Sequence, residues 1–217
     1  ITDQNILIEL TGIEGLNSEM LVNLPDNIRI RISDYNQNHY NSNSSPQSSL
    51  ATLDHLTYSP YELQVIMDRI NNIKNGIDKN WNDYQKTEYI YNYLKNHVKY
   101  EAPLEGTAHR TKNYDGLGLL IAGTSTCQGF AHTYKILLNS LGIQCEEVWG
   151  QLNAQGKHAY NVVKIGNNTF VVDTVRNKMG KYEDTGFGVD LNTVQNQYSD
   201  KTNNDLMKDL NSYYDTT

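Results

Sequence analysis

Two stretches of the chain repeat apolar residues at helical spacing and predict amphipathic helices. The first begins at Ser59, a typical N-cap, with Pro60 at the first helical position and Glu62 completing a capping box. Its apolar stripe consists of Leu63, Ile66, Met67, Ile70, Ile73 and Ile77. The second helix is predicted from about residue 82 to residue 98. Its inner face consists of Ile90, Tyr93, Leu94, His97 and Val98, and we interpret both stripes as core.

A third helical pattern begins at Cys127. The preceding segment 124–126 (Thr-Ser-Thr) predicts a hydroxyl N-cap, and Gly142 ends the pattern. The apolar positions between them are Phe130, Ala131, Tyr134, Leu137, Leu138 and Leu141. Cys127 is therefore expected in the first helical turn, where the helix dipole stabilises a thiolate and nearby N–H groups can bind an oxyanion. The alternative interpretation is a buried structural thiol.

Two alternating segments beyond this helix predict antiparallel strands. Segment 157–165 carries His158 on one face, and segment 169–175 carries Asp173 on one face. Between them, residues 166–168 (Gly-Asn-Asn) are typical of a tight turn.

The length of that turn decides whether the histidine and the aspartate meet. With a two-residue loop, Ile165 pairs with Asn168, and paired residue numbers add up to 333. His158 then lies opposite Val175, with Asp173 as its diagonal neighbour on the same face. Diagonal Cβ atoms lie about 7 Å apart or slightly less, within reach of an imidazole–carboxylate hydrogen bond. An odd loop length would place the two side chains on opposite faces.

A cysteine, a histidine and an aspartate in these settings are typical of a thiol enzyme. A cysteine thiolate attacks a carbonyl, a histidine transfers the proton, and a carboxylate orients the imidazole. Taken singly, His158 is equally typical of a surface or core histidine, and Asp173 of a strand end. Their even-offset register, with Cys127 upstream, favours the catalytic interpretation.

These residues occur in a set of motifs that resembles the bacterial branch of the transglutaminase-like superfamily. The chain has Tyr160 where tryptophan is usual, and Arg176 where a second tryptophan often follows the aspartate. The close resemblance covers about residues 112–176. The motifs are Cys127-Gln128-Gly129-Phe130-Ala131, Leu141-Gly142-Ile143, Val148-Trp149-Gly150, His158-Ala159-Tyr160-Asn161 and Phe170-Val171-Val172-Asp173.

The resemblance implies an α+β fold with a papain-like core, in which N-terminal helices precede a nucleophile helix packed on an antiparallel sheet. It also implies roles for particular residues. Cys127 would be the nucleophile, His158 the general base and acid, and Asp173 the orienting carboxylate. The backbone N–H of Cys127 would bind the oxyanion, with Tyr114 as the candidate side-chain donor and Gln128 as a further candidate contact to oxyanion or substrate.

Three functions remain open. The leading one is acyl transfer from a protein or peptide amide, such as a Gln side chain, through a Cys127 thioester. A Lys amine as acceptor gives a cross-link, and water gives deamidation. The second function is peptide-bond hydrolysis by the same triad. The third is a non-catalytic binding module, against which the complete triad argues.

A Gly-containing segment, 101–126, predicts a loop that lines the substrate cleft.

The chain divides into four parts along its length. The parts are residues 1–33, a short β segment with predicted strands at 6–10 and 28–32 and an open role; 34–50, a flexible Asn/Ser-rich linker or loop; 51–180, a transglutaminase-like catalytic domain; and 181–217, a C-terminal extension.

Composition excludes several partners. The formal charge of −7 disfavours nucleic acid and anionic membrane surfaces, which require a basic face. The sequence contains no stretch of about 18 apolar residues, which a membrane-spanning helix would need. No phosphate-binding glycine loop or Asp-rich calcium loop is present, so no cofactor is implied.

The two cysteines do not indicate a metal site or a disulfide framework. Cys127, His132 and Cys145 lack the short paired spacings of structural zinc ligands. Cys145 starts a predicted strand, and we expect it in the core as a free thiol.

Location is suggested only by composition. The chain begins with Ile1 instead of methionine and contains an Asn/Ser-rich linker, which together favour a secreted or cell-surface protein. A cytoplasmic protein remains the alternative.

Overall fold

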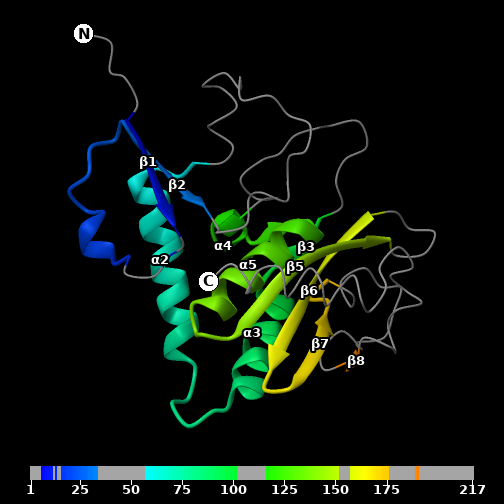
Figure 1. The fold of residues 1–217 in the computed structure, drawn as a ribbon. Coiled ribbons are helices and arrows are strands. Elements are labelled where there is room, and N and C mark those ends of the chain that lie inside the picture. Colours follow the sequence, from blue (N-terminus) through cyan, green and yellow to red (C-terminus); the bar gives the residue numbers. More distant parts are fainter. Residues whose placement is uncertain are drawn as a thin grey trace.

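The computed structural model describes residues 6–11, 13, 16–33, 57–101, 116–151, 157–175 and 189–190. Its architecture is α+β, as predicted (Figure 1). It contains the helices α2 (Pro60–Asn75), α3 (Asp83–His97) and α5 (Cys127–Asn139), of which α5 packs on a four-stranded sheet. The sheet has the order β5-β6-β7-β8, with strands Gln144–Gln151, Lys157–Ile165, Asn168–Val172 and Val189–Asp190, and neighbouring strands are antiparallel.

The first two long helices begin with capping boxes. The Ser59 hydroxyl accepts from the Glu62 N–H at 3.2 Å, and the Glu62 carboxylate accepts from the Ser59 N–H at 2.8 Å. Asn82 and Gln85 form the corresponding pair at the start of α3. These reciprocal bonds satisfy N–H groups that the helix itself leaves without partners, and the first box confirms the sequence prediction.

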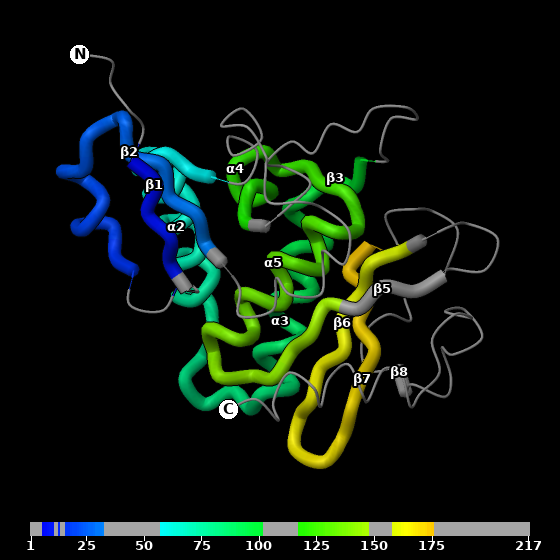
Figure 2. The backbone as a smooth tube through the Cα atoms, turned by 45° about the horizontal axis from the view of Figure 1, so that its top comes forward, coloured from blue at the N-terminus to red at the C-terminus, as the bar shows by residue number. Residues whose placement is uncertain are grey.

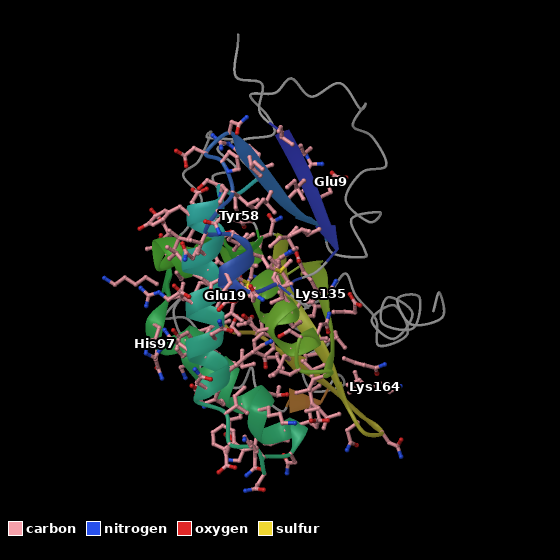
Figure 3. The ribbon with its side chains drawn as sticks, turned by 90° about the vertical axis from the view of Figure 1, so that its left-hand side faces the viewer. Glu9, Glu19, Tyr58, His97, Lys135 and Lys164 are labelled. Carbon is pink, nitrogen blue, oxygen red and sulfur yellow. The ribbon has the colours of Figure 1, made fainter. Side chains whose placement is uncertain are left out.

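One residue of the predicted inner face of α3 lies elsewhere. His97 is exposed (Figure 3), where it stacks on Tyr93 with ring centroids 4.3 Å apart and bonds the Tyr93 carbonyl through Nδ1 at 2.8 Å. The core positions of this helix are Ile90, Tyr91 and Leu94, so the prediction for His97 was wrong. An aromatic neighbour at i−4 gives the imidazole apolar contact without burial.

Helix α5 lies at the centre of the molecule. Figure 2 shows it with α2 on one side and strands β5 to β7 on the other, and it also packs against α3. Its side chains Phe130, Tyr134, Leu137 and Leu138 are 0–1% exposed. The helix that carries the cysteine is therefore held by apolar contacts on several sides.

Strands β6 and β7 pair in the predicted register. Ile165 pairs with Asn168, and every further pair up to Asn161 with Val172 adds up to 333. Gly166 has a φ of +59°, which a glycine adopts without strain in a two-residue turn.

The ladder is shorter than predicted, because Val175 was expected opposite His158 and the pairing stops at Val172. Asp173 provides the reason: its Oδ1 accepts from the Val175 N–H at 3.0 Å. This local bond to the backbone competes with the ladder and turns the chain out of the sheet.

Residues 116–125, the later part of the predicted loop 101–126, form short regular elements. Strand β3 (Lys99–Tyr100) pairs in parallel with β4 (Thr124–Ser125), and η4 (Gly116–Gly118) and α4 (Leu119–Ala122) precede β4. The prediction of a loop was therefore wrong for residues 116–125, and residues 102–115 lie outside the described part of the chain. The glycines hid a short buried apolar run, and Gly123, with a φ of +69°, ends α4.

The predicted N-terminal strands are present and run parallel to each other. They are β1 (Ile6–Thr11) and β2 (Ile28–Ser33), with η1 (Ser18–Met20) between them. The parallel pairing excludes a hairpin of β1 and β2. The residues of the predicted linker, 34–50, and of the extension apart from β8 lie outside the described part of the chain.

Tyr58, labelled in Figure 3, joins the N-terminal strands to η4, which precedes α5 in the chain. Its backbone exchanges two hydrogen bonds with Ile30 of β2, at 2.8 and 2.7 Å. Its buried hydroxyl accepts from the Leu117 N–H in η4 at 3.0 Å. Ile28, Ile30 and Leu21 belong to the same hydrophobic cluster as helices α2 and α5.

The substitution Tyr58→Phe should destabilise the protein. It leaves the buried Leu117 N–H without its acceptor, which costs about 1–3 kcal/mol. Urea unfolding measures this loss, with Tyr61→Phe on the exposed side of α2 as the matched control. Equal unfolding midpoints for the two variants would contradict the role of this bond.

Candidate active site

Cys127 is the first residue of α5 and is partly exposed. Thr126, the N-cap residue, has extended backbone angles (φ −86°, ψ 176°), but its hydroxyl makes no capping hydrogen bond. The position of the N-cap was therefore predicted correctly, but the predicted hydrogen bond from the helix to the cap hydroxyl is absent. The helix start retains the N–H groups and partial positive charge that favour an anion.

His158 and Asp173 form a buried pair at the end of the sheet. His158 Nε2 lies 2.8 Å from Asp173 Oδ2, and the two residues are 3% and 1% exposed. The hydrogen bond that the register predicts is therefore present. The second carboxylate oxygen is held by the Val175 N–H, so the aspartate is oriented from both sides.

The protonation of His158 depends on both neighbours. Burial lowers the pKa of His158, but the charge and hydrogen bond of Asp173, and a hydrogen bond and charge from Cys127, raise it to about 10. Because Nε2 faces the carboxylate, Nδ1 is the nitrogen available to the cysteine sulfur. At neutral pH the ring is an imidazolium between the carboxylate of Asp173 and the sulfur of Cys127.

Asn161 ties the cysteine helix to the strands that carry the histidine. Its Nδ2 donates to the Ala131 carbonyl of α5 at 2.9 Å and to the Glu146 carbonyl of β5 at 3.2 Å. Asn161 lies on β6, three residues from His158, and is fully buried. This amide therefore fixes the helix against the sheet one turn from Cys127.

Two side-chain contacts reinforce the same junction. Lys135 Nζ lies 3.1 Å from Glu146 Oε2, and both side chains are almost fully buried. His132 Nδ1 lies 3.2 Å from Glu147 Oε2. Sequence analysis missed Lys135 because its position on the helix suggested no partner.

Tyr100 is a site residue that sequence analysis missed. It is partly buried on β3, and burial raises the pKa of its phenol, with the charges of Cys127 and Asp173 raising it further. The backbone of Tyr100 pairs with that of Ser125, two residues before Cys127. No sequence pattern predicts that a two-residue strand will pair in parallel with another strand of the same length.

The other predicted site residues have different outcomes. Tyr114 lies outside the described residues. Gln128 is the second residue of α5 and is partly exposed. Cys145 is fully buried on β5, where its N–H donates to Asn139 Oδ1 at 3.0 Å, and both cysteines are free.

The described ranges offer neither a cluster of metal ligands nor a membrane-spanning helix. They contain no group of three or more His, Cys, Asp or Glu side chains that could hold a metal ion. None of their helices is long and apolar enough to cross a membrane.

Residues 71–174 match the family model of the transglutaminase-like superfamily, which confirms the resemblance drawn from the motifs. The match begins inside α2 and ends one residue after Asp173. No curated protein matches the chain.

Solved structures show more distant similarities. A candidate cysteine protease from Cytophaga hutchinsonii is 24% identical, with a TM-score of 0.42 over 51% of this chain and 38% of that one. A TGase is 16% identical, with a TM-score of 0.48 over 73% and 41%. Legionella pneumophila LapG is 14% identical, with a TM-score of 0.39 over 54% and 64%. The chain thus spans less than two thirds of each of these structures.

Cys127 should react with iodoacetamide at pH 6 at least about tenfold faster than Cys145. It is partly exposed beside a protonated imidazole, whereas Cys145 is fully buried. Peptide mass spectrometry over time measures both rates, and the unfolded protein, in which the two should react alike, is the control. Equal rates in the folded protein would count against the thiolate assignment.

The His158–Asp173 pair should make stability depend on pH. Folding raises the pKa of His158 from 6.5 to about 10. The contribution of the protonated ring to the free energy of unfolding is therefore complete below about pH 6.5 and is lost as the pH rises through about 10. The stability gap between the native protein and Asp173→Asn should therefore narrow across this window by a few kcal/mol. Denaturant unfolding at several pH values measures the gap, and a constant gap would refute the coupling. His158→Gln is the control, because Asp173→Asn should add no pH dependence to it.

Proposed function

With a transglutaminase-like core at residues 71–174 as the premise, we propose that this protein transfers acyl groups from protein or peptide amides through a thioester on Cys127. The observation that carries the proposal is the position of His158 between the thiol of Cys127 and the buried carboxylate of Asp173. These three groups, each beside the next, provide a nucleophile, a proton carrier and an orienting charge.

The first half of the reaction forms the thioester. The Cys127 thiolate attacks the amide carbon, a carbon–sulfur bond forms, and the carbonyl electron pair moves onto oxygen. The helix start of α5 faces that oxyanion with N–H groups. When the intermediate collapses, the carbon–nitrogen bond breaks and the leaving amine takes a proton from His158.

The second half consumes the thioester. His158, now neutral, accepts a proton from the incoming nucleophile while that nucleophile attacks the thioester carbon. A Lys amine gives an isopeptide cross-link, and water gives the carboxylic acid. The thiolate leaves as the carbon–sulfur bond breaks, and Asp173 again stabilises the imidazolium.

The site geometry supports transfer from a Gln side chain and hydrolysis of a peptide bond through the same steps. The donor and the acceptor are selected by the shape of the surface around Cys127 and not by the triad itself. Gln amide transfer is the leading form of the proposal, and peptide hydrolysis is its alternative.

Mass spectrometry of a Gln-containing protein substrate incubated with an amine probe tests the proposal. The native protein should attach the probe to Gln, and Cys127→Ala should attach none. Cys145→Ala is the matched control and should keep activity, because Cys145 packs in the core away from the proposed chemistry. Asp173→Asn should lower kcat by about 10⁴ through the wrong imidazole tautomer, whereas Asp68→Asn on the exposed side of α2 should not.

Other products would change the assignment. Conversion of Gln to Glu without probe would indicate deamidation, and cleaved peptides without probe would indicate a peptidase. Probe attachment that survives Cys127→Ala would refute the thioester mechanism. A protein with no thiol-dependent change in any substrate, and with equal alkylation of Cys127 and Cys145, would be a binding module.

A further inference from the structure

The amide of Asn161 connects the helix that carries Cys127 with the strand that carries His158. Asn161 lies on β6, three residues after His158, and its Nδ2 donates to the Ala131 carbonyl of α5 at 2.9 Å. Ala131 follows Cys127 by four residues, which is about one helical turn. The bond therefore joins the two elements close to the two residues that have to meet.

The same nitrogen also reaches β5. Nδ2 of Asn161 donates to the Glu146 carbonyl at 3.2 Å. An asparagine amide has two N–H donors on one nitrogen, so a single side chain can bind two carbonyls on different elements. An ionised aspartate has no donor and would place a negative oxygen against two carbonyl oxygens. The arrangement therefore requires an amide, and a polar group of the same shape is not enough.

The oxygen of this amide limits what the residue adds to stability. Asn161 is 0% exposed, and within the described residues its Oδ1 has no hydrogen-bond partner. A buried acceptor without a partner costs free energy, which offsets part of the contribution of the two donated bonds. These two bonds are directional, so their main effect is on the position of α5.

Tyr134 anchors the same helix to a different element. Its hydroxyl donates to the Thr87 carbonyl of α3 at 3.1 Å, and the tyrosine is fully buried. This bond holds α5 as directly as the bond of Asn161 does, but α3 carries no residue of the predicted triad. Tyr134 and Asn161 therefore form a matched pair, of which Asn161 anchors the helix to the strand of His158.

We propose that Asn161 is a positioning residue, which holds α5 at the place on β6 where the sulfur of Cys127 and the imidazole of His158 meet. This inference rests on the proposed function. Apolar packing is non-directional and permits a small slide of the helix. A hydrogen bond is lost when its atoms separate by a further distance of about 1 Å, and a misplacement of that size costs about 100-fold in rate.

Alkylation of Cys127 at two pH values reports on this position. A thiol beside an imidazolium reacts as a thiolate well below the pH at which an ordinary thiol ionises. An ordinary thiol, with a pKa of about 8.5, is ionised to less than about 1% at pH 6 and to about 90% at pH 9.5. A Cys127 that has moved away from His158 would therefore lose reactivity at pH 6 and keep it at pH 9.5.

The experiment compares the native protein with Asn161→Leu, which has a similar shape and no donor, and with Tyr134→Phe. Peptide mass spectrometry gives the rate of iodoacetamide alkylation at Cys127, and urea unfolding shows that each variant is folded. The rate in Asn161→Leu should fall by about 10- to 100-fold at pH 6 and stay within about twofold at pH 9.5. Tyr134→Phe should keep the native rate at both pH values, although it loses a buried bond.

Two further measurements separate positioning from support of the fold. In transfer of the amine probe to Gln, Asn161→Leu should lower kcat by about 10- to 100-fold with KM unchanged within about twofold. Asn161→Thr suits a strand and keeps one donor. It should show a smaller loss of the same kind, and it provides the test if the leucine variant does not fold.

Three results would overturn the positioning role. A native alkylation rate at pH 6 in the Asn161 variants would show that α5 keeps its place without the amide. An equal loss at pH 6 and pH 9.5 would show that the cysteine has become less accessible. An equal loss at pH 6 in Tyr134→Phe would show a general loosening of the helix.

Failure of the proposed function gives a different result. If the native protein changes no amide substrate while alkylation at pH 6 still depends on Asn161, acyl transfer is refuted and the positioning role is supported. If Cys127 and Cys145 alkylate equally fast in the native protein at pH 6, both are refuted.

Discussion

The buried contact between His158 and Asp173 is the interaction on which the rest of the site depends. An imidazolium that is almost fully removed from water is costly unless a partner compensates its charge, and the carboxylate at 2.8 Å is that partner. The carboxylate is in turn oriented by the Val175 N–H. Because charge and orientation come together, the ring presents one nitrogen to Asp173 and the other to Cys127.

A second constraint fixes the helix that carries Cys127 relative to the strand that carries His158. Apolar packing of α5 on the sheet is non-directional and by itself permits small sliding movements. The amide of Asn161 and the buried contact of Lys135 with Glu146 are directional, and they fix the helix to β5 and β6. Cys127 and His158 thus belong to different elements whose relative position is set by polar bonds.

Sequence reasoning was strongest where one local pattern determines geometry. The capping box at Ser59 and the register of β6 with β7 follow from spacing alone, so the contact of His158 with Asp173 was predictable. The pairing beyond Val172 was not, since a side chain competed with the ladder.

Contacts between distant segments were harder to predict. The pairing of Tyr100 with Ser125 joins two-residue strands far apart in the chain, and nothing in either segment specifies the other. The same holds for Asn161, whose place in the motif was visible but whose bonds to α5 and β5 depend on how the helix docks. Long-range polar contacts therefore marked the limit of prediction.

The bond from Leu117 to Tyr58 shows that the family match and the folding unit have different boundaries. The match begins at residue 71, within α2, yet the capping box that starts this helix and the tyrosine that holds η4 both lie before it. β2 continues the same network through Ile30. A chain trimmed to the matched residues would keep Cys127, His158 and Asp173 while losing part of the scaffold that supports the approach to the nucleophile. The part of the chain that folds as one unit therefore extends beyond the matched residues, because hydrogen bonds such as that from Leu117 to Tyr58 connect residues on both sides of the start of the match.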